Sequence, residues 1–475
     1  MKVVATPYEY FNARIFNAKS ENILNNDFRF NAEYYEEGTS ITISNEIDFF
    51  PLSQIASVVF PGIFKRYLVD DIKNGIKFLT TSDIMMLEPD TDKILSEHLT
   101  SNLPIYRVQE HTLLVSRSGT IGNTIYVDDR IKEFAITEDA LRVKPFDEKN
   151  IGFLYFYFTS EYGNGTITGK KSGAVIDHIY EEDLLKLPIP KLDEQLCNQF
   201  FETYLRVKSN REKADKIIKQ ARILVLQYNN LPPLSDIKPE TLDADGEVEI
   251  RMTGLEEFEN GWRLDAHFYN LKAKEIIRKI QNNSSCNSKL EEVSEDIIIG
   301  KRFKRNYVES DHGTPFIGSK NILQIRPSDL KYLSNSEISF MDDLILKSGM
   351  ILIACSGSLG GTFGKTCLVH KNFEDFAASQ HILRIVPNND KIDSGYLYAY
   401  LSSEYGYFSI TRYRWGALID EIDDEDMADV IIPICNDSKQ NEIGDLVRKA
   451  YELRAEAIKL EDEAQELLTQ ALTQV

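Results

Sequence analysis

Two stretches of the chain carry apolar side chains at alternating spacings of three and four residues, one after Pro190 and one after Pro433. This rhythm is typical of a coiled-coil seam along one face of an α-helix. A helix of about 35 residues is about 50 Å long. We expect two such helices to pack on each other in antiparallel orientation and to act as a spacer. The predicted seam contains Val207, Ala214, Ile218, Ala221 and Val225, interrupted by Arg211, in the first helix and Leu446, Leu453, Leu460 and Leu467 in the second.

The segments that precede these helices mix two other patterns. Residues 113–116 and 350–354 are apolar and are shortly followed by Ser-Gly, which indicates buried strands entering tight turns. Residues 151–160 and 395–403 are rich in aromatic residues and leucine, and we expect helices there. Each half of the chain is therefore predicted to form a mixed α/β (α+β) domain.

The two halves share a series of motifs in the same order and at a nearly constant offset. Chance similarity would preserve neither, so the sequence predicts a tandem pair of pseudo-symmetric domains. The paired segments are residues 29–35 with 263–269, 64–66 with 303–305, 75–78 with 313–316, 114–122 with 352–360, 160–163 with 403–406, 173–177 with 416–420, and 189–190 with 432–433.

These patterns divide the chain into five parts. We predict a first domain at residues 1–190, a spacer helix at 191–230, a linker at 231–260, a second domain at 261–435 and a C-terminal helix at 436–475. Two prolines at 232–233 end the first helix. Between Asp236 and Asp265 there are ten acidic and three basic residues, so the linker region is strongly acidic.

The formal net charge of −21 argues against a DNA-binding function, because phosphate contacts need Lys and Arg. Its distribution weakens that argument, since the acid is clustered and basic islands remain elsewhere. Five scattered cysteines without a Cys-x-x-Cys pair favour reduced thiols over disulfides or a zinc site. The first residues resemble no export signal and no apolar run is long enough to cross a bilayer, so a cytoplasmic location is expected.

No motif in the chain has the spacing that catalysis would require. The string Gly364-Lys365-Thr366 resembles a phosphate-binding loop, but Leu359 stands where that loop needs glycine. The segment 230–234 interrupts the tetrapeptide that a DNA methyltransferase would need, and the seven histidines lack metal-ligand spacing. We therefore expect a non-catalytic chain that holds neither a cofactor nor a metal.

Basic residues recur at equivalent places in the two halves. Lys301 to Arg305 contains four bases matched by Lys65 and Arg66, and Arg412 to Trp415 is matched by Lys170 and Lys171. Arginine and lysine beside aromatic residues supply phosphate contacts, and arginine reads guanine edges. Ordinary solvated charge is the alternative for each single residue. The predicted DNA-binding residues are Lys65, Arg66, Arg117, Ser118, Lys170, Lys171, Lys301, Arg302, Lys304, Arg305, Lys365, Arg412, Arg414 and Trp415.

Two domains that each end in Ile-Pro before a long helix resemble the specificity subunit of type I restriction-modification enzymes. The motifs that carry the resemblance are residues 118–122, 173–177 and 187–190 and their second copies. The resemblance implies that each target-recognition domain reads one half of a split DNA sequence, while the helices set the gap and dock methyltransferase (M) subunits. Those partners would bind S-adenosylmethionine and methylate adenine, and a motor-nuclease (R) subunit would use ATP and magnesium.

Two rival interpretations stay open. An acidic scaffold or DNA mimic that binds only proteins would explain the net charge, although the duplicated basic islands speak against it. A freestanding enzyme would need a catalytic constellation that the sequence does not contain. The acidity also suggests that basic partners supply phosphate affinity, or that the chain serves a variant defence system.

Overall fold

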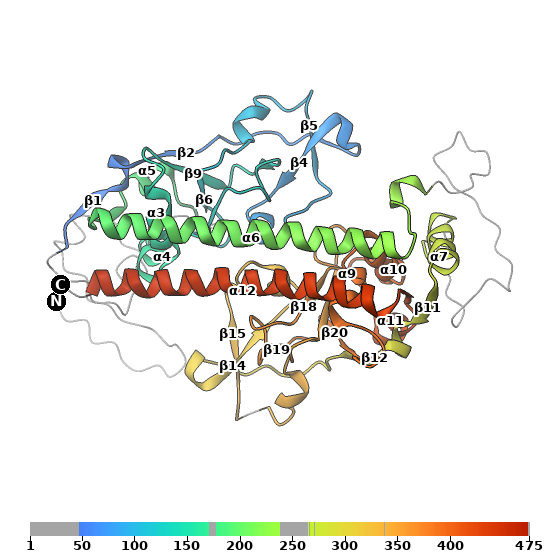
Figure 1. Ribbon diagram of the computed structural model, residues 1–475. Coiled ribbons are helices and arrows are strands. Elements are labelled where there is room, and N and C mark those ends of the chain that lie inside the picture. Colours follow the sequence, from blue (N-terminus) through green and yellow to red (C-terminus); the bar gives the residue numbers. More distant parts are fainter. Residues whose placement is uncertain are drawn as a thin grey trace, which may run out of the picture.

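The computed structural model describes residues 47–170, 177–237, 265, 267–269, 271–336 and 338–473. Two long helices, α6 (Glu194–Tyr228) and α12 (Asp437–Thr473), lie side by side through its centre. The sheets of the first half lie on one side of this helix pair and those of the second half on the other (Figure 1). The predicted fold class, two pseudo-symmetric mixed α/β domains joined by long antiparallel helices, is confirmed.

Contacts between α6 and α12 show that the two helices run in opposite directions. The hydroxyl of Tyr228, the last residue of α6, donates to Glu442 near the start of α12 at 2.8 Å. Arg206, nearer the start of α6, lies 3.7 Å from Glu456 further along α12. The pair therefore forms a single rod to which both domains attach.

Both domains have the same strand order. In the first, one sheet runs β2-β9-β6-β7 and the other β3-β5-β4-β8; in the second, the orders are β12-β20-β16-β18 and β13-β15-β14-β19. The strand pairs β1-β10 and β11-β22 also correspond, and β17-β21 is a further pair in the second domain. The first domain contains β1 (Phe49–Pro51), β2 (Ala56–Val59), β3 (Leu68–Val69), β4 (Gly75–Leu79), β5 (Ile94–Ser96), β6 (Leu113–Ser116), β7 (Thr124–Tyr126), β8 (Ala135–Ile136), β9 (Ala140–Pro145), α3 (Asn150–Thr159), α4 (Glu161–Thr168), α5 (Glu181–Leu185) and β10 (Pro188–Pro190). The second contains α7 (Leu271–Asn283), β11 (Cys286–Lys289), α8 (Leu290–Val293), β12 (Ser294–Ile299), β13 (Tyr307–Val308), β14 (Gly313–Ile317), β15 (Lys331–Ser334), β16 (Ile351–Ala354), β17 (Ser356–Gly357), β18 (Thr366–Leu368), β19 (Ala377–Ala378), β20 (Ile382–Pro387), α9 (Ser394–Leu401), α10 (Glu404–Arg412), β21 (Asp420–Glu421), α11 (Asp424–Ala428) and β22 (Ile431–Ile434).

The helices α3 and α9 connect each domain to the rod. Both are apolar on all sides and almost entirely buried, as expected for helices enclosed in a core. A glycine brings each one close to a rod helix. A Cβ on Gly152 would lie 2.5 Å from the Phe200 carbonyl oxygen, and one on Gly395 would lie 2.8 Å from the Cα of Gly444. Any larger residue at these two positions would push its domain away from the rod.

The buried face of the rod differs in register from the predicted seam. The structure buries the five seam residues named for α6, and Leu460 of α12, but it leaves Leu446, Leu453 and Leu467 half-buried. Val447 and Leu468 are buried instead, because α12 packs against α3 and α9 as well as α6 and needs a wider apolar face. Arg211 does not interrupt the packing. It is 4% exposed and forms part of a buried ion pair described below.

Candidate nucleic-acid interface

In the second domain, Arg305 marks the centre of a polar cluster that two distant segments build. Its guanidinium lies 5.1 Å from the ring centroid of Phe316 on β14 and donates to the Gln380 side chain at 2.5 Å. The next residue, His381, places its Nδ1 2.6 Å from the hydroxyl of Ser356. These five residues are called the second cradle.

The first domain contains the same arrangement, which we call the first cradle. Arg66 lies 5.1 Å from the ring centroid of Phe78 and donates to Glu138 at 2.9 Å. Asp139 and Ser118 occupy the positions of His381 and Ser356. The sequence repeat therefore places an equivalent cluster of side chains in each domain.

Backbone hydrogen bonds hold both cradles in the same frame. The amide of Arg117 donates to the Asp139 carbonyl at 2.8 Å, and the amide of Cys355 donates to the His381 carbonyl at 3.1 Å. The amides of Ile179 and Ile422 then donate to the carbonyls of residues 117 and 355, both at 3.1 Å. These main-chain hydrogen bonds hold residues 139 and 381 in the same place in each domain, whichever side chain is present.

Exposed cations surround the cradles. Lys65, Lys301, Arg302 and Lys304 are exposed, and the Arg66 side chain is 42% exposed. Burial lowers the pKa of His381 below its usual value, and the charges of Arg305 and Arg302 lower it further. The second cradle therefore presents a neutral imidazole among fixed positive charges near pH 7. This combination suits contact with a phosphate backbone and a base edge.

Three other predicted DNA-binding arginines make contacts within the protein. Arg117 is only 7% exposed and lies between the rings of Phe60 and Tyr180, at 4.4 and 5.6 Å. Arg412 lies 3.8 Å from the Phe268 ring centroid, and Arg414 donates to a backbone carbonyl at 3.1 Å. These three guanidinium groups support local packing. Trp415 is 44% exposed, Ser118 and Lys170 are half-buried, and Lys171 lies outside the described residues.

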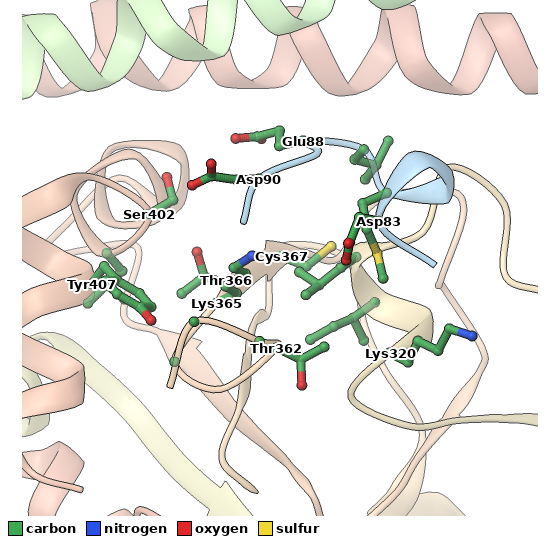
Figure 2. A pocket seen from close by; sticks show the side chains of 18 of the residues that line it. Asp83, Glu88, Asp90, Lys320, Thr362, Lys365, Thr366, Cys367, Ser402 and Tyr407 are labelled. Carbon is green, nitrogen blue, oxygen red and sulfur yellow. The ribbon is translucent and has the colours of Figure 1, made fainter. Parts of the chain in front are cut away.

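Lys365 lies in a different place, a cavity of about 540 Å³ between the two domains. Figure 2 shows its side chain beside Thr366, facing Asp90 from the first domain, with Tyr407 of α10 at one side. Asp90 is paired with Lys77, and Asp83 accepts two hydrogen bonds from Thr80. The structure therefore does not bring Lys365 together with the second cradle.

An ion-pair cluster at the edge of this cavity ties the first domain to the rod. Glu88 accepts hydrogen bonds from Arg222 of α6 and Arg454 of α12, each at 3.1 Å. At the equivalent position in the second domain, Arg326 contacts Glu461 and Asp462 of α12. Glu461 also accepts from Arg211 of α6 at 2.7 Å. We call these two clusters the locks; each joins one domain loop to both rod helices.

The same two loops also pair with each other across the centre of the molecule. The Leu87 amide donates to the Leu323 carbonyl at 2.8 Å, and the Ile325 amide donates to the Met85 carbonyl at 3.0 Å. Because residues 85 and 87 correspond to 323 and 325, this pair of bonds straddles a local pseudo-twofold axis. The domains are therefore held directly against each other as well as against the rod.

The first lock predicts a pH dependence of stability. Burial would raise the pKa of Glu88, but Arg222 and Arg454 outweigh it and hold the pKa at about 2, below 4.5. The pair should stabilise the fold fully above pH 4.5 and lose its effect as the pH falls toward 2. We expect Glu88→Gln to melt several degrees below the unsubstituted chain at pH 7, and we expect the difference in melting temperature to shrink to a small part of that value at pH 2.5, where the pH approaches the folded pKa. An equal difference in melting temperature at both pH values would contradict this assignment.

Sequence reasoning named the arginines of the cradles but missed Glu138, Asp139, Gln380 and His381. An alignment of the two halves could have identified them, because it places residues 138–139 opposite residues 380–381, and the side chains of the two pairs differ in chemistry. Within the described part of the chain, no three His, Cys, Asp or Glu side chains gather as metal ligands, and no helix is long and apolar enough to span a membrane.

The chain is thus a two-domain protein in which each domain repeats one arginine cradle and both domains attach to the same helical rod. The family model described as "Type I restriction modification DNA specificity domain" matches residues 45–217 and again residues 284–465, so the chain belongs to this family. It is a DNA specificity subunit of a type I restriction-modification system, the non-catalytic component of the enzyme complex. The interpretations as a DNA mimic or a freestanding enzyme are thereby set aside.

Three chains of known structure from type I systems match over most of this chain's length, each with a TM-score below 0.5. The S subunit of the type I system from M. genitalium matches at 12% identity with a TM-score of 0.35, covering 92% of this chain and 98% of that one. The HsdS subunit from Thermoanaerobacter tengcongensis matches at 15% identity with a TM-score of 0.27, covering 92% and 98%. A chain from a study of complex assembly and conformational transition of the type I system matches at 16% identity with a TM-score of 0.26, covering 91% and 99%. No curated protein matches the chain.

Proposed function

We propose that this subunit reads a bipartite DNA target, with one half-site under each domain and with the rod setting the separation of the half-sites. The observation that carries the proposal is the repetition of one arginine cradle in two domains that the locks fix to the same rod. Two readers held at fixed separation impose a fixed spacing on the DNA sequence, as dimeric DNA-binding proteins do. The cradles differ in their polar residues, so the two half-sites should differ in sequence.

We further propose that the rod docks adenine-specific methyltransferase (M) subunits, which bind S-adenosylmethionine, and that a motor-nuclease (R) subunit using ATP and magnesium joins them in the cytoplasm. Apolar side chains on the outside of the rod support a docking role. Leu205 and Ile223 of α6 are 37% and 54% exposed, and Leu205 shares a groove with the half-buried Leu453 of α12. Partners with basic surfaces would also offset the net charge of −21.

The test of DNA reading uses a library of randomised duplexes. The full-length chain purified with its methyltransferase subunits should enrich two short motifs separated by an invariant gap, and salt should weaken binding steeply. Enrichment of a single continuous motif would contradict the bipartite reading. Displacement of the methyltransferase subunits by DNA would instead indicate that the chain only mimics DNA.

The docking proposal predicts a separate result for Leu205→Asp. A charge in the groove should reduce recovery of methyltransferase subunits with the tagged chain by about tenfold, since apolar contacts at an interface centre contribute about 1 to 2 kcal/mol each. The melting temperature of the isolated chain should change little, because Leu205 is already 37% exposed. Leu99→Asp, at a 62% exposed position of the first domain, is the matched control. Unchanged recovery for Leu205→Asp would exclude this groove.

A further inference from the structure

The two cradles combine an invariant frame with variable polar groups. Arginine, phenylalanine and serine are common to both, and each arginine lies 5.1 Å from its phenylalanine ring centroid. Two adjacent positions differ. The first cradle has Glu138 and Asp139, whereas the second has Gln380 and His381. Within the cradles, the arginine, phenylalanine and serine are therefore shared by the two domains, and the two polar positions beside them distinguish one domain from the other.

The fold itself does not require these particular side chains. The carbonyls of residues 139 and 381 accept the same backbone hydrogen bond in both domains, at 2.8 and 3.1 Å, whether an aspartate or a histidine is present. Both pairs immediately precede corresponding strands, β9 and β20. The Asp139 side chain is 33% exposed, and Gln380 and His381 are half-buried, so solvent or a ligand reaches these three. The Glu138 side chain is only 7% exposed and lies behind them, paired with Arg66.

The chemistry of the two pairs is different. Ionised carboxylates only accept hydrogen bonds, while the Gln380 amide both donates and accepts. In the second cradle the Gln380 nitrogen lies 2.8 Å from His381 Nε2, so the two side chains form one hydrogen-bonded unit with Ser356. In the first cradle Asp139 lies 3.7 Å from the Arg117 guanidinium, and Glu138 is held by Arg66.

We propose that Asp139, next to the buried Glu138, and Gln380 with His381 are the specificity-determining residues of the two half-sites. The inference rests on the proposed bipartite reading and adds the base chemistry to it. Carboxylates select base edges that donate, so the first pair favours the amino groups of cytosine or adenine. The Gln380 amide matches the paired donor and acceptor of adenine in the major groove. The arginine of each cradle, held on its phenylalanine, then contacts guanine or phosphate beside them.

The test exchanges one pair for the chemistry of the other and measures which bases are selected. With the randomised duplex library and the full complex, Gln380→Glu should change the preferred base at one position of one half-site by about tenfold, because a good bidentate contact discriminates by about 1 to 3 kcal/mol. The other half-site and the gap should be unchanged. Selection identical to the unsubstituted complex, with binding retained, would overturn the inference while leaving bipartite reading intact.

Two further variants keep the result interpretable. Gln281→Glu makes the same charge change at an exposed position of α7 and should leave the selected sequence unchanged. If Gln380→Glu does not fold, His381→Asn removes the imidazole with a neutral polar side chain and should alter the same half-site. Failure of the unsubstituted complex to select any split motif would instead refute the proposed function itself.

Discussion

Replacing Glu461 with leucine is expected to lower the free energy of unfolding by about 3 to 5 kcal/mol, because it leaves a buried arginine without its partner. The side chains of Arg211 and Glu461 are each 3% exposed, and Glu461 also accepts a hydrogen bond from Tyr155 at 2.6 Å. Because only 3% of the Arg211 side chain is exposed, solvent cannot readily replace a lost carboxylate. The expected measurement is a lower urea midpoint for the full-length chain.

The double variant Arg211→Met with Glu461→Leu provides the internal control. Replacing both members of a buried ion pair by apolar groups of similar size is often close to neutral, so the double variant should recover most of the lost stability. Glu466→Leu, at an exposed position of the same helix, should change stability by less than about 0.5 kcal/mol. If Glu461→Leu is no worse than Glu466→Leu, the pair has no structural role.

The locks hold both domains in fixed positions on the rod. Glu88 and Arg326 occupy equivalent positions in the two domains but carry opposite charges, and each pairs with complementary residues on the rod. Each lock contains residues of both α6 and α12, so neither domain can rotate without breaking ion pairs with the rod. This coupling, together with the hydrogen bonds between residues 85–87 and 323–325, supports the proposal of a fixed spacing between half-sites.

Local patterns in the sequence predicted the architecture well. Heptad spacing indicated both rod helices, aromatic segments indicated α3 and α9, and repeated motifs indicated two equivalent domains. Each of these patterns can be recognised within a single helix or strand, or by comparing a segment with its repeat in the other half of the chain. The register of the α12 seam was less well predicted, because its buried face depends on α3 and α9, which no periodicity within α12 describes.

Side-chain contacts between residues that are far apart along the chain could not be predicted from the sequence. Arg211 looks like an interruption of its helix until Glu461, 250 positions away, is placed beside it. Glu138 and Gln380 carry no motif, and their role emerges only when Arg66 and Arg305 are brought against them. Arg117, which the sequence predicts to bind DNA, lies between two aromatic rings, an environment that its neighbours in the sequence do not indicate. Side-chain environment, more than element type, limited the prediction of the site.

Removing both cradle arginines should have the largest effect on DNA binding. Each guanidinium that contacts a base or phosphate contributes about 1 to 3 kcal/mol, so Arg66→Ala with Arg305→Ala should weaken binding of the full complex to its target by at least about thirtyfold. Each single variant should lose affinity by roughly the square root of that factor, because the two sites lie in different domains and their effects should add.

The salt dependence distinguishes a direct contact from a folding defect. If the arginines touch phosphate, the slope of log affinity against log salt should fall by about one for each contact removed, whereas partial unfolding would reduce the active fraction without changing the slope. Lys149→Ala, which removes an exposed cation next to the start of α3, controls for net charge. Unaltered affinity and slope in the double variant would show that the cradles do not face DNA, since no other change could restore two lost cationic contacts.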